Sequence, residues 1–271
     1  MTAPDNQTLP SVDGLSVTLA NGVLSVTIDR PDSLNSVTTA VLAGIADAME
    51  NAAHDPQVRV VRLGGSGRGF CSGAGISAPA AGEASASEMP TQIIAEANRA
   101  IRAIVALPRP VVAVVQGPAA GVGVSLALAC DLVVASDQAF FVLAFTKIGL
   151  MPDGGASALV AAAIGRIRAM RLTLLADRLS ADDALECGLI STVVSAEDFD
   201  AEVDALLSRL LAGPAAAFAK TKHAINAATL TELDATLDRE YVGQSQLLNA
   251  HDFREGARAF QERRAAHFTD S

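Results

Sequence analysis

Tryptophan is absent from this 271-residue chain, and tyrosine occurs only once. Half of the residues are hydrophobic and only 18% are charged, so a substantial core is expected and extensive disorder is not. With so few large aromatic side chains, that core must pack through small residues on closely spaced elements. The length is that of one large domain, or of one domain with an appendage.

Positive charge is also scarce. The chain has 20 Lys and Arg against 30 Asp and Glu, which gives a net charge of −10. This balance argues against a nucleic-acid-binding protein, which needs a basic face. It does not exclude an anionic ligand, because a few local arginines or helix N-termini can hold phosphates.

Cysteines and long apolar runs are few. Cys71, Cys130 and Cys187 are far apart and form no CxxC pair, so reduced thiols in a cytoplasmic protein are expected. The start, "MTAPDNQTLPSVDG", has neither the basic nor the apolar region of a signal peptide. Runs such as "VSLALAC" are too short to cross a bilayer. We therefore expect no membrane partner and no nucleic-acid partner.

Several common motifs are missing. The chain lacks a complete GxGxxG fingerprint, GxxxxGK[ST], GxSxG and HExxH, which sets aside dinucleotide, P-loop, serine-hydrolase and zincin chemistry. Its four histidines are scattered, mostly in polar helical context, and surface or packing roles are favoured over metal ligation: His54, His223, His251 and His267. The sequence therefore predicts no metal site.

The periodicity that is present predicts an α/β fold. Residues 15–29 form two alternating runs around Asn21-Gly22, which is typical of a hairpin. Thr38 is a candidate N-cap for a helix that runs to about His54. Further strands are expected within 58–65, 109–117, 132–137, 139–143 and 189–195, and helices after Ala196 with start signals at Gly213-Pro214 and Thr231. Residues 78–90 suggest a lid or a surface loop, with a helix following to about Leu107.

Two strand-to-helix turns are rich in glycine: "FCSGAG" at 70–75 and "AAGVGVS" at 119–125. Such turns bring the backbone close to a ligand and expose N–H groups at a helix start. If each turn supplies one N–H to the same oxygen, the pair makes an oxyanion hole from main chain. Tight packing of strand onto helix explains the glycines equally well.

Six segments in order resemble the enoyl-CoA hydratase/isomerase, or crotonase, family: "RPDSLNS", "GGSGRGFCSGAGIS", "QGPAAGVGVSLALACD", "IGLMPDGGAS", "LSADDALECGLISTVV" and "DFREGARAFQERRAAHF". The resemblance implies a spiral of ββα turns with an acyl-CoA site over residues 1–195. It implies a helical oligomerisation region over 196–271, and so a homotrimer or a dimer of trimers. The substrate would be an acyl-CoA thioester, with coenzyme A part of the substrate and no separate cofactor.

The resemblance also assigns roles in the first glycine turn and in the second. The two oxyanion donors would be Ala74, after Gly73, and Val122, between Gly121 and Gly123. Gly75 stands where the family usually has an aspartate, which removes a polar contact near the nucleotide end.

Coenzyme A would lie between the 30–35 loop and the Ser72–Ile76 turn. Arg30 would help to bind the phosphates of coenzyme A. A solvated arginine at the end of a strand explains Arg30 equally well. Phe268, near the end of the chain, would reach a coenzyme A site, in some family members that of a neighbour.

The position of the acid distinguishes the possible reactions. The two glutamates of family hydratases fall on Ser125 and Phe145, and neither side chain can act as a carboxylate base. Asp153, in "MPDGG", stands where several members without the glutamate pair carry their acid. Without the resemblance, Asp153 is best interpreted as the N-cap of the next helix; a base on a first helical turn can fill both roles.

We therefore predict an enoyl-CoA isomerase in which Asp153 moves a proton from C2 to C4, so that a 3-enoyl thioester becomes a 2-enoyl one. An apolar wall that includes Phe145, Leu150 and Met151 would raise the pKa of Asp153 toward the useful range. The alternatives are an atypical hydratase, a non-catalytic acyl-CoA-binding trimer, and nucleophilic attack by Asp153 on an activated ring.

Overall fold

The structure is a computed structural model that describes residues 7–75 and 88–270. Within them, a seven-stranded sheet has the order β1-β2-β3-β4-β5-β7-β10. Its strands are β1 Gln7–Thr8, β2 Leu15–Ala20, β3 Val23–Ile28, β4 Val60–Gly65, β5 Val111–Val115, β7 Leu132–Ser136 and β10 Thr192–Val194. Strands β3, β4, β5, β7 and β10 are parallel, and β1 and β2 add an antiparallel edge.

The predicted hairpin is confirmed. β2 and β3 pair antiparallel with Ala20 opposite Val23, and their side chains alternate between buried and partly exposed. Asn21 and Gly22 have φ values of 51° and 83°. Two consecutive positive φ angles are what a two-residue turn needs to follow the twist of its strands, and Asn-Gly supplies them at low cost.

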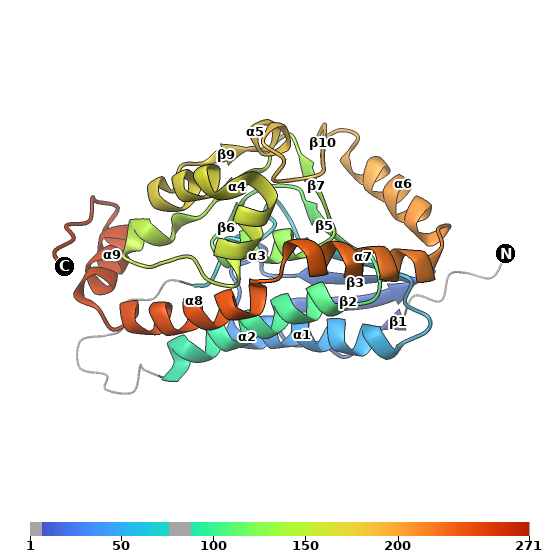
Figure 1. Ribbon diagram of the computed structural model, residues 1–271, viewed down its shortest axis with the longest axis horizontal. Helices are drawn as coiled ribbons and strands as arrows, with labels where there is room; N and C mark the ends of the chain where they lie inside the picture. Colours follow the sequence, from blue (N-terminus) through green and yellow to red (C-terminus); the bar gives the residue numbers. More distant parts are fainter. Residues whose placement is uncertain (1–6, 76–87, 271) are drawn as a thin grey trace.

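Helices cover both faces of the sheet (Figure 1). One face packs on α1 Thr39–His54, α2 Glu88–Ala106 and α3 Val122–Ala129, and the other on α6 Phe199–Leu211. Alternation along the strands makes this possible: Val61 faces the first layer and Val60 the second. Thr38 caps α1 as predicted, and its Oγ1 accepts from the Val41 N–H at 3.3 Å.

A second, three-stranded sheet joins β6 Ala119–Ala120, β8 Phe140–Val142 and β9 Leu179–Ser180. After β8 the chain forms the short 3₁₀ helix η2 Ala144–Ile148, the helix α4 Ala156–Leu175, which is kinked at Gly165, and α5 Ala181–Glu186. The other 3₁₀ helix, η1 Pro31–Ser33, lies between β3 and α1.

The last helices return to the first ones. Figure 1 shows α7 Ala215–Thr229 and α8 Leu233–Leu247 running alongside α1 and α2. Arg102 of α2 holds α8 through Asp234 at 2.8 Å and Asp238 at 3.1 Å. The helix α9 His251–Glu262 packs on η2, with Phe253 and Ala257 against Ile148. The helices after β10 therefore pack on earlier elements, α8 on α2 and α9 on η2.

Several boundaries differ from the predictions. Residues 88–90 begin α2, so the loop prediction was wrong there; residues 78–87 lie outside the described residues. The Thr231 signal is two residues early, because α8 begins at Leu233 with Glu232 as its N-cap. The short strands β6 and β9 were not predicted. In the described ranges, no helix is both long and apolar enough to cross a membrane.

Candidate active site

The two glycine turns lie against each other through their backbones. Cys71 forms a parallel bridge with Ala119, and the Ala120 N–H donates to the Cys71 carbonyl at 2.8 Å. Gly73 has a φ of 92°, and a Cβ placed on it would lie 3.0 Å from the Ala120 carbonyl oxygen. Glycine is therefore favoured at position 73 for two reasons: its positive φ, and the close approach of the second turn.

Among the described residues, neither candidate donor uses its N–H in a backbone hydrogen bond. Val122 is the first residue of α3, whose opening N–H groups have no partner within the helix. The positive φ of this turn, 53°, falls on Gly121, so a valine fits at 122 without strain. Ala74 is exposed, and its N–H donates to no backbone oxygen of the described residues.

The acid loop packs directly on the second turn. The Ser125 hydroxyl donates to the Asp153 carbonyl oxygen at 2.8 Å. A Cβ on Gly154 would lie 3.1 Å from Ser125 Cβ and 3.2 Å from Val122 Cγ2. Phe145 also belongs here, since its Cζ would be 3.7 Å from a Cβ on Gly121. The fold thus brings the second turn, Phe145 and Asp153 together.

The N-cap interpretation of Asp153 is wrong. The N-cap position of α4 is Gly155, which has no side chain that could form a capping hydrogen bond. Instead the Glu240 carboxylate of α8 accepts from the Gly155 N–H at 2.6 Å and from the Ser157 N–H at 2.9 Å. The Asp153 carboxylate is thereby released from capping, and its Oδ2 accepts from Gln244 Nε2 at 2.9 Å.

The environment of Asp153 favours its neutral form. Burial raises the pKa of Asp153 to about 7; the hydrogen bond from Gln244 lowers it, and the nearby Glu240 raises it further. The direction agrees with the expectation from an apolar wall. A carboxyl that titrates near neutrality can both accept and return a proton under physiological conditions.

Gln244 and Glu240 were missed by sequence reasoning. Both lie on α8, in the region predicted to serve oligomerisation, and both are almost fully buried. A signal was present, because they continue the helical spacing of Leu233 and Leu237. Polar residues on the apolar stripe of a helix need partners, and here the partners are the acid loop.

The candidate coenzyme A residues show mixed placement. The Ser72 hydroxyl donates to the Ser33 carbonyl at 2.9 Å, so the first turn and the 30–35 loop are in contact. Arg30 is half-buried and packs along Gly14, and its Nε is buried without a partner among the described residues. Among the described residues, no atom lies within 4 Å of a Cβ placed on Gly75. Ile76 lies outside the described residues.

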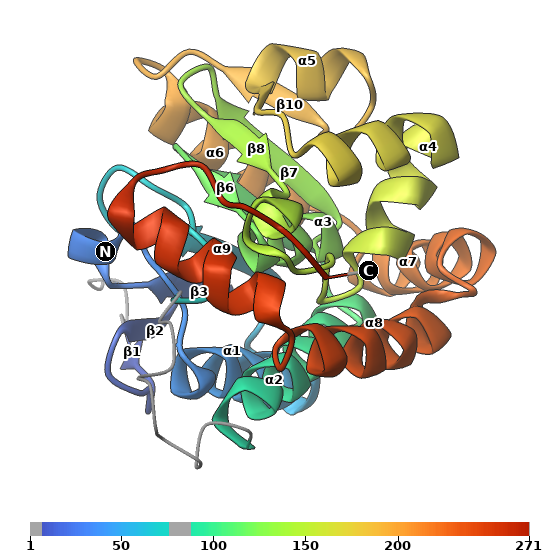
Figure 2. The ribbon, with the colours of Figure 1, turned by 90° about the vertical axis from the view of Figure 1, so that its left-hand side faces the viewer.

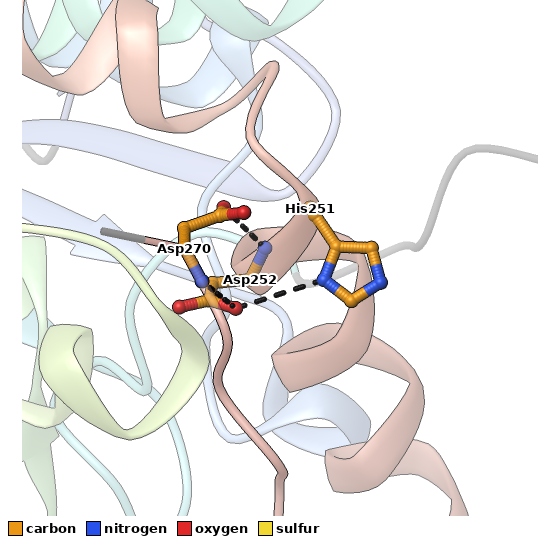
Figure 3. Close-up of side chains that lie close together, drawn as sticks. All are labelled: His251, Asp252 and Asp270. Carbon is orange, nitrogen blue, oxygen red and sulfur yellow. Dashed lines mark hydrogen bonds and ion pairs between the residues drawn. The ribbon is translucent and has the colours of Figure 1, made fainter.

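The C-terminal tail is fastened to the start of α9 (Figures 2 and 3). Asp252 Oδ1 accepts from the N–H groups of Thr269, at 2.7 Å, and Asp270, at 3.2 Å, and the Asp252 N–H donates to Asp270 Oδ2 at 2.8 Å. Phe268 lies within this tail with 41% of its surface exposed. Its predicted role at a coenzyme A site stays a prediction.

His251 joins Asp252 and Asp270 in the one group of possible metal ligands found among the described residues. Figure 3 shows how the three side chains gather at the helix start. The hydrogen bonds of the tail already account for both carboxylates. The predicted lack of a metal site stays a prediction.

Comparisons with known proteins agree with this architecture. The sequence profile of the enoyl-CoA hydratase/isomerase family matches residues 18–271. A probable enoyl-CoA hydratase of Rhodobacter capsulatus is 39% identical over 251 residues, which cover 93% of this chain and 96% of that protein. The 1,2-epoxyphenylacetyl-CoA isomerase of Escherichia coli is 37% identical over 249 residues, which cover 92% and 95%.

Among solved structures, an enoyl-CoA hydratase from Mycobacterium avium subsp. paratuberculosis is 66% identical. It matches with a TM-score of 0.90 over 96% of this chain and 100% of that chain. The α/β fold with a C-terminal helical region, predicted from the resemblance, is thus confirmed. The chain belongs to the enoyl-CoA hydratase/isomerase family.

Proposed function

We propose that this protein is an enoyl-CoA isomerase that converts 3-enoyl thioesters into 2-enoyl thioesters. One observation carries the proposal: the carboxyl beside the second glycine turn is Asp153, with a pKa of about 7 set mainly by burial. The positions that would hold the hydratase glutamates carry Ser125 and Phe145. A single carboxyl suffices for a proton shift, whereas family hydration employs two.

In the proposed mechanism the thioester oxygen lies between the N–H groups of Ala74 and Val122. The Asp153 carboxylate removes a proton from C2, and the negative charge develops on that oxygen as an enolate. Each donor in such a hole contributes about 2.7–4 kcal/mol to transition-state stabilisation. The protonated Asp153 then delivers the same proton to C4, so no cofactor is consumed and coenzyme A remains part of the substrate.

A second candidate, an atypical hydratase, is favoured by the names of two relatives, including the structure that is 66% identical. In that case Asp153 alone would activate the water. The fully buried Ser125 cannot substitute for a glutamate there, because its hydroxyl donates to the Asp153 backbone. A non-catalytic acyl-CoA-binding protein is the third candidate.

The deciding assay offers a panel of 3-enoyl- and 2-enoyl-CoA thioesters to the purified protein. Isomerisation of 3-hexenoyl-CoA with little hydration of crotonyl-CoA supports the proposal. Efficient hydration of crotonyl-CoA favours the second candidate. Calorimetric binding of an acyl-CoA without turnover of any panel member favours the third.

We also propose a homotrimer or a dimer of trimers. The outer surface carries large apolar side chains on several late helices, with Ile167 76% exposed on α4, Val242 57% on α8 and Phe260 62% on α9. Large apolar side chains left exposed on three helices support burial of this surface between subunits. Light scattering at micromolar concentration is expected to give at least three times the 27.7 kDa chain mass; a monomer would refute the assembly.

A further inference from the structure

Gln244 of α8 contacts the acid loop with both ends of its amide. Its Oε1 accepts from the Met151 N–H at 3.1 Å, and its Nε2 donates to Asp153 Oδ2 at 2.9 Å. The orientation of the amide follows from its partners. A backbone N–H can only donate, so the oxygen must face Met151 and the NH₂ group must face the carboxylate.

This arrangement makes the two oxygens of the Asp153 carboxyl unequal. Oδ2 faces an N–H donor, which stabilises it as an acceptor and disfavours a proton on it. A proton on Asp153 therefore belongs on Oδ1. The Gln244 side chain is only 2% exposed and is held at both ends, so it does not rotate freely to exchange these roles.

We infer that Gln244 is a positioning residue that holds Asp153 by Oδ2, so that Oδ1 alone carries the proton between C2 and C4. The inference rests on the proposed isomerase function for the identity of the reaction. The contact between Gln244 and Asp153 is independent of it.

The rest of α8 supports this assignment. Glu240 lies one turn before Gln244 and binds the Gly155 and Ser157 N–H groups, so one helix grips the acid loop on both sides of Asp153. α8 is in turn held to α2 by Arg102 and by Asn98, whose Nδ2 donates to the Leu237 carbonyl at 3.2 Å. Figure 2 shows α8 next to α2 and below α3.

Among the described residues, few charged groups act on Asp153. Glu240 is the one charged group that shifts its titration, while α3 contributes Ser125 and η2 contributes Phe145, both uncharged. Removing the Gln244 donor should therefore have a clear sign. The pKa of Asp153 should rise, because the hydrogen bond that favours its ionised form is lost.

The test compares Gln244→Leu and Gln244→Met, which both lack the N–H donor, with Gln246→Leu at an exposed position of α8. Asp153 is observed directly by ¹³C NMR of protein labelled at the aspartate carboxyl carbon, with Asp153→Asn to assign its signal. Both Gln244 variants should titrate Asp153 at higher pH than wild type. Methionine is unbranched, as glutamine is, and has no N–H donor, so Gln244→Met keeps the test usable if the leucine variant does not fold.

Kinetics provide the second readout. In the Gln244 variants kcat should fall by about 10², the effect of a small misplacement of a reacting group, with KM nearly unchanged. The acid limb of the kcat/KM profile should move to higher pH, and Gln246→Leu should match wild type in both. A merely structural role would change stability without moving this limb.

Unchanged titration and unchanged kcat in both Gln244 variants would overturn the inference. If the Asp153 signal shifts as expected but wild type isomerises no enoyl-CoA, the positioning of Asp153 stands and the proposed isomerase function fails. The two ideas are thus separated by a measurement that needs no substrate.

Discussion

The two glycine turns and the acid loop are built in opposite ways. The turns at Gly73 and Gly121 carry the candidate backbone N–H donors. The two turns contact each other through the backbone of Cys71 and of residues 119–120. The acid loop offers one side chain, Asp153, which is held by Gln244 from a helix 91 residues further along the chain. The position of the Asp153 carboxyl thus depends on side chains that substitution can remove. The position of the candidate donors depends on the path of the main chain.

The largest expected effect comes from Asp153→Asn. An amide cannot take up the proton, so turnover of 3-hexenoyl-CoA should fall by about 10²–10⁴, the contribution of a general base. Affinity for the acyl-CoA should change little, because the donors are backbone groups. Steady-state kinetics with calorimetric binding test both points, and a variant that keeps wild-type turnover would assign the chemistry to another group.

Gly73→Ala should disrupt the first glycine turn instead of the acid loop. The new Cβ meets the Ala120 carbonyl at 3.0 Å at a φ of 92°, so the donor turn must shift. Turnover should fall by up to about 10², the lower effect of losing one oxyanion donor. Gly165→Ala is the matched control: its φ is 77°, but its Cβ would meet no atom of the described residues within 4 Å.

Both glycine variants should lose about 1–3 kcal/mol of unfolding free energy, since alanine is strained in the positive-φ conformations of these glycines. Only Gly73→Ala should lose activity. Urea unfolding beside the enoyl-CoA assay separates the two effects. Equal activity in the two variants would show that the first turn has no part in the reaction.

Asp153→Asn should also change stability with pH. The pKa of Asp153 rises from 3.8 to about 7 on folding, mainly through burial, so its ionisation destabilises the folded state. The wild-type penalty is absent below about pH 4 and complete above about pH 7, where it is at most ~4 kcal/mol for about three pKa units. Urea unfolding should show Asp153→Asn more stable than wild type at pH 8, with this advantage gone at pH 4.

The smallest expected effect is a shift of the pH profile. Since the base must be ionised, wild-type kcat/KM should rise with pH through about 7. Glu240 raises the pKa of Asp153, so Glu240→Gln should move this rise to lower pH. Glu186→Gln, at an exposed site on α5, should leave the profile in place. A shift to higher pH in Glu240→Gln would contradict the electrostatic account.

Local patterns predicted much of this structure. Asn21-Gly22 specified the hairpin and Thr38 the start of α1, because each signal acts within a few residues. The two glycine turns were identified from their spacing, but their direct contact requires the sheet to be assembled. The cap assignment of Asp153 failed because Glu240, distant in sequence, occupies the N–H groups that a local cap would take.

The central claim is that Asp153, held by α8, carries one proton from C2 to C4. Its most direct test is 3-hexenoyl-CoA deuterated at C2, incubated in ordinary water with wild type and with Asp153→Asn. Wild type should deliver part of the deuterium to C4 of the product and lose the rest to solvent, while the asparagine form should do neither. Loss of C2 deuterium from the asparagine form at the wild-type rate would contradict the account.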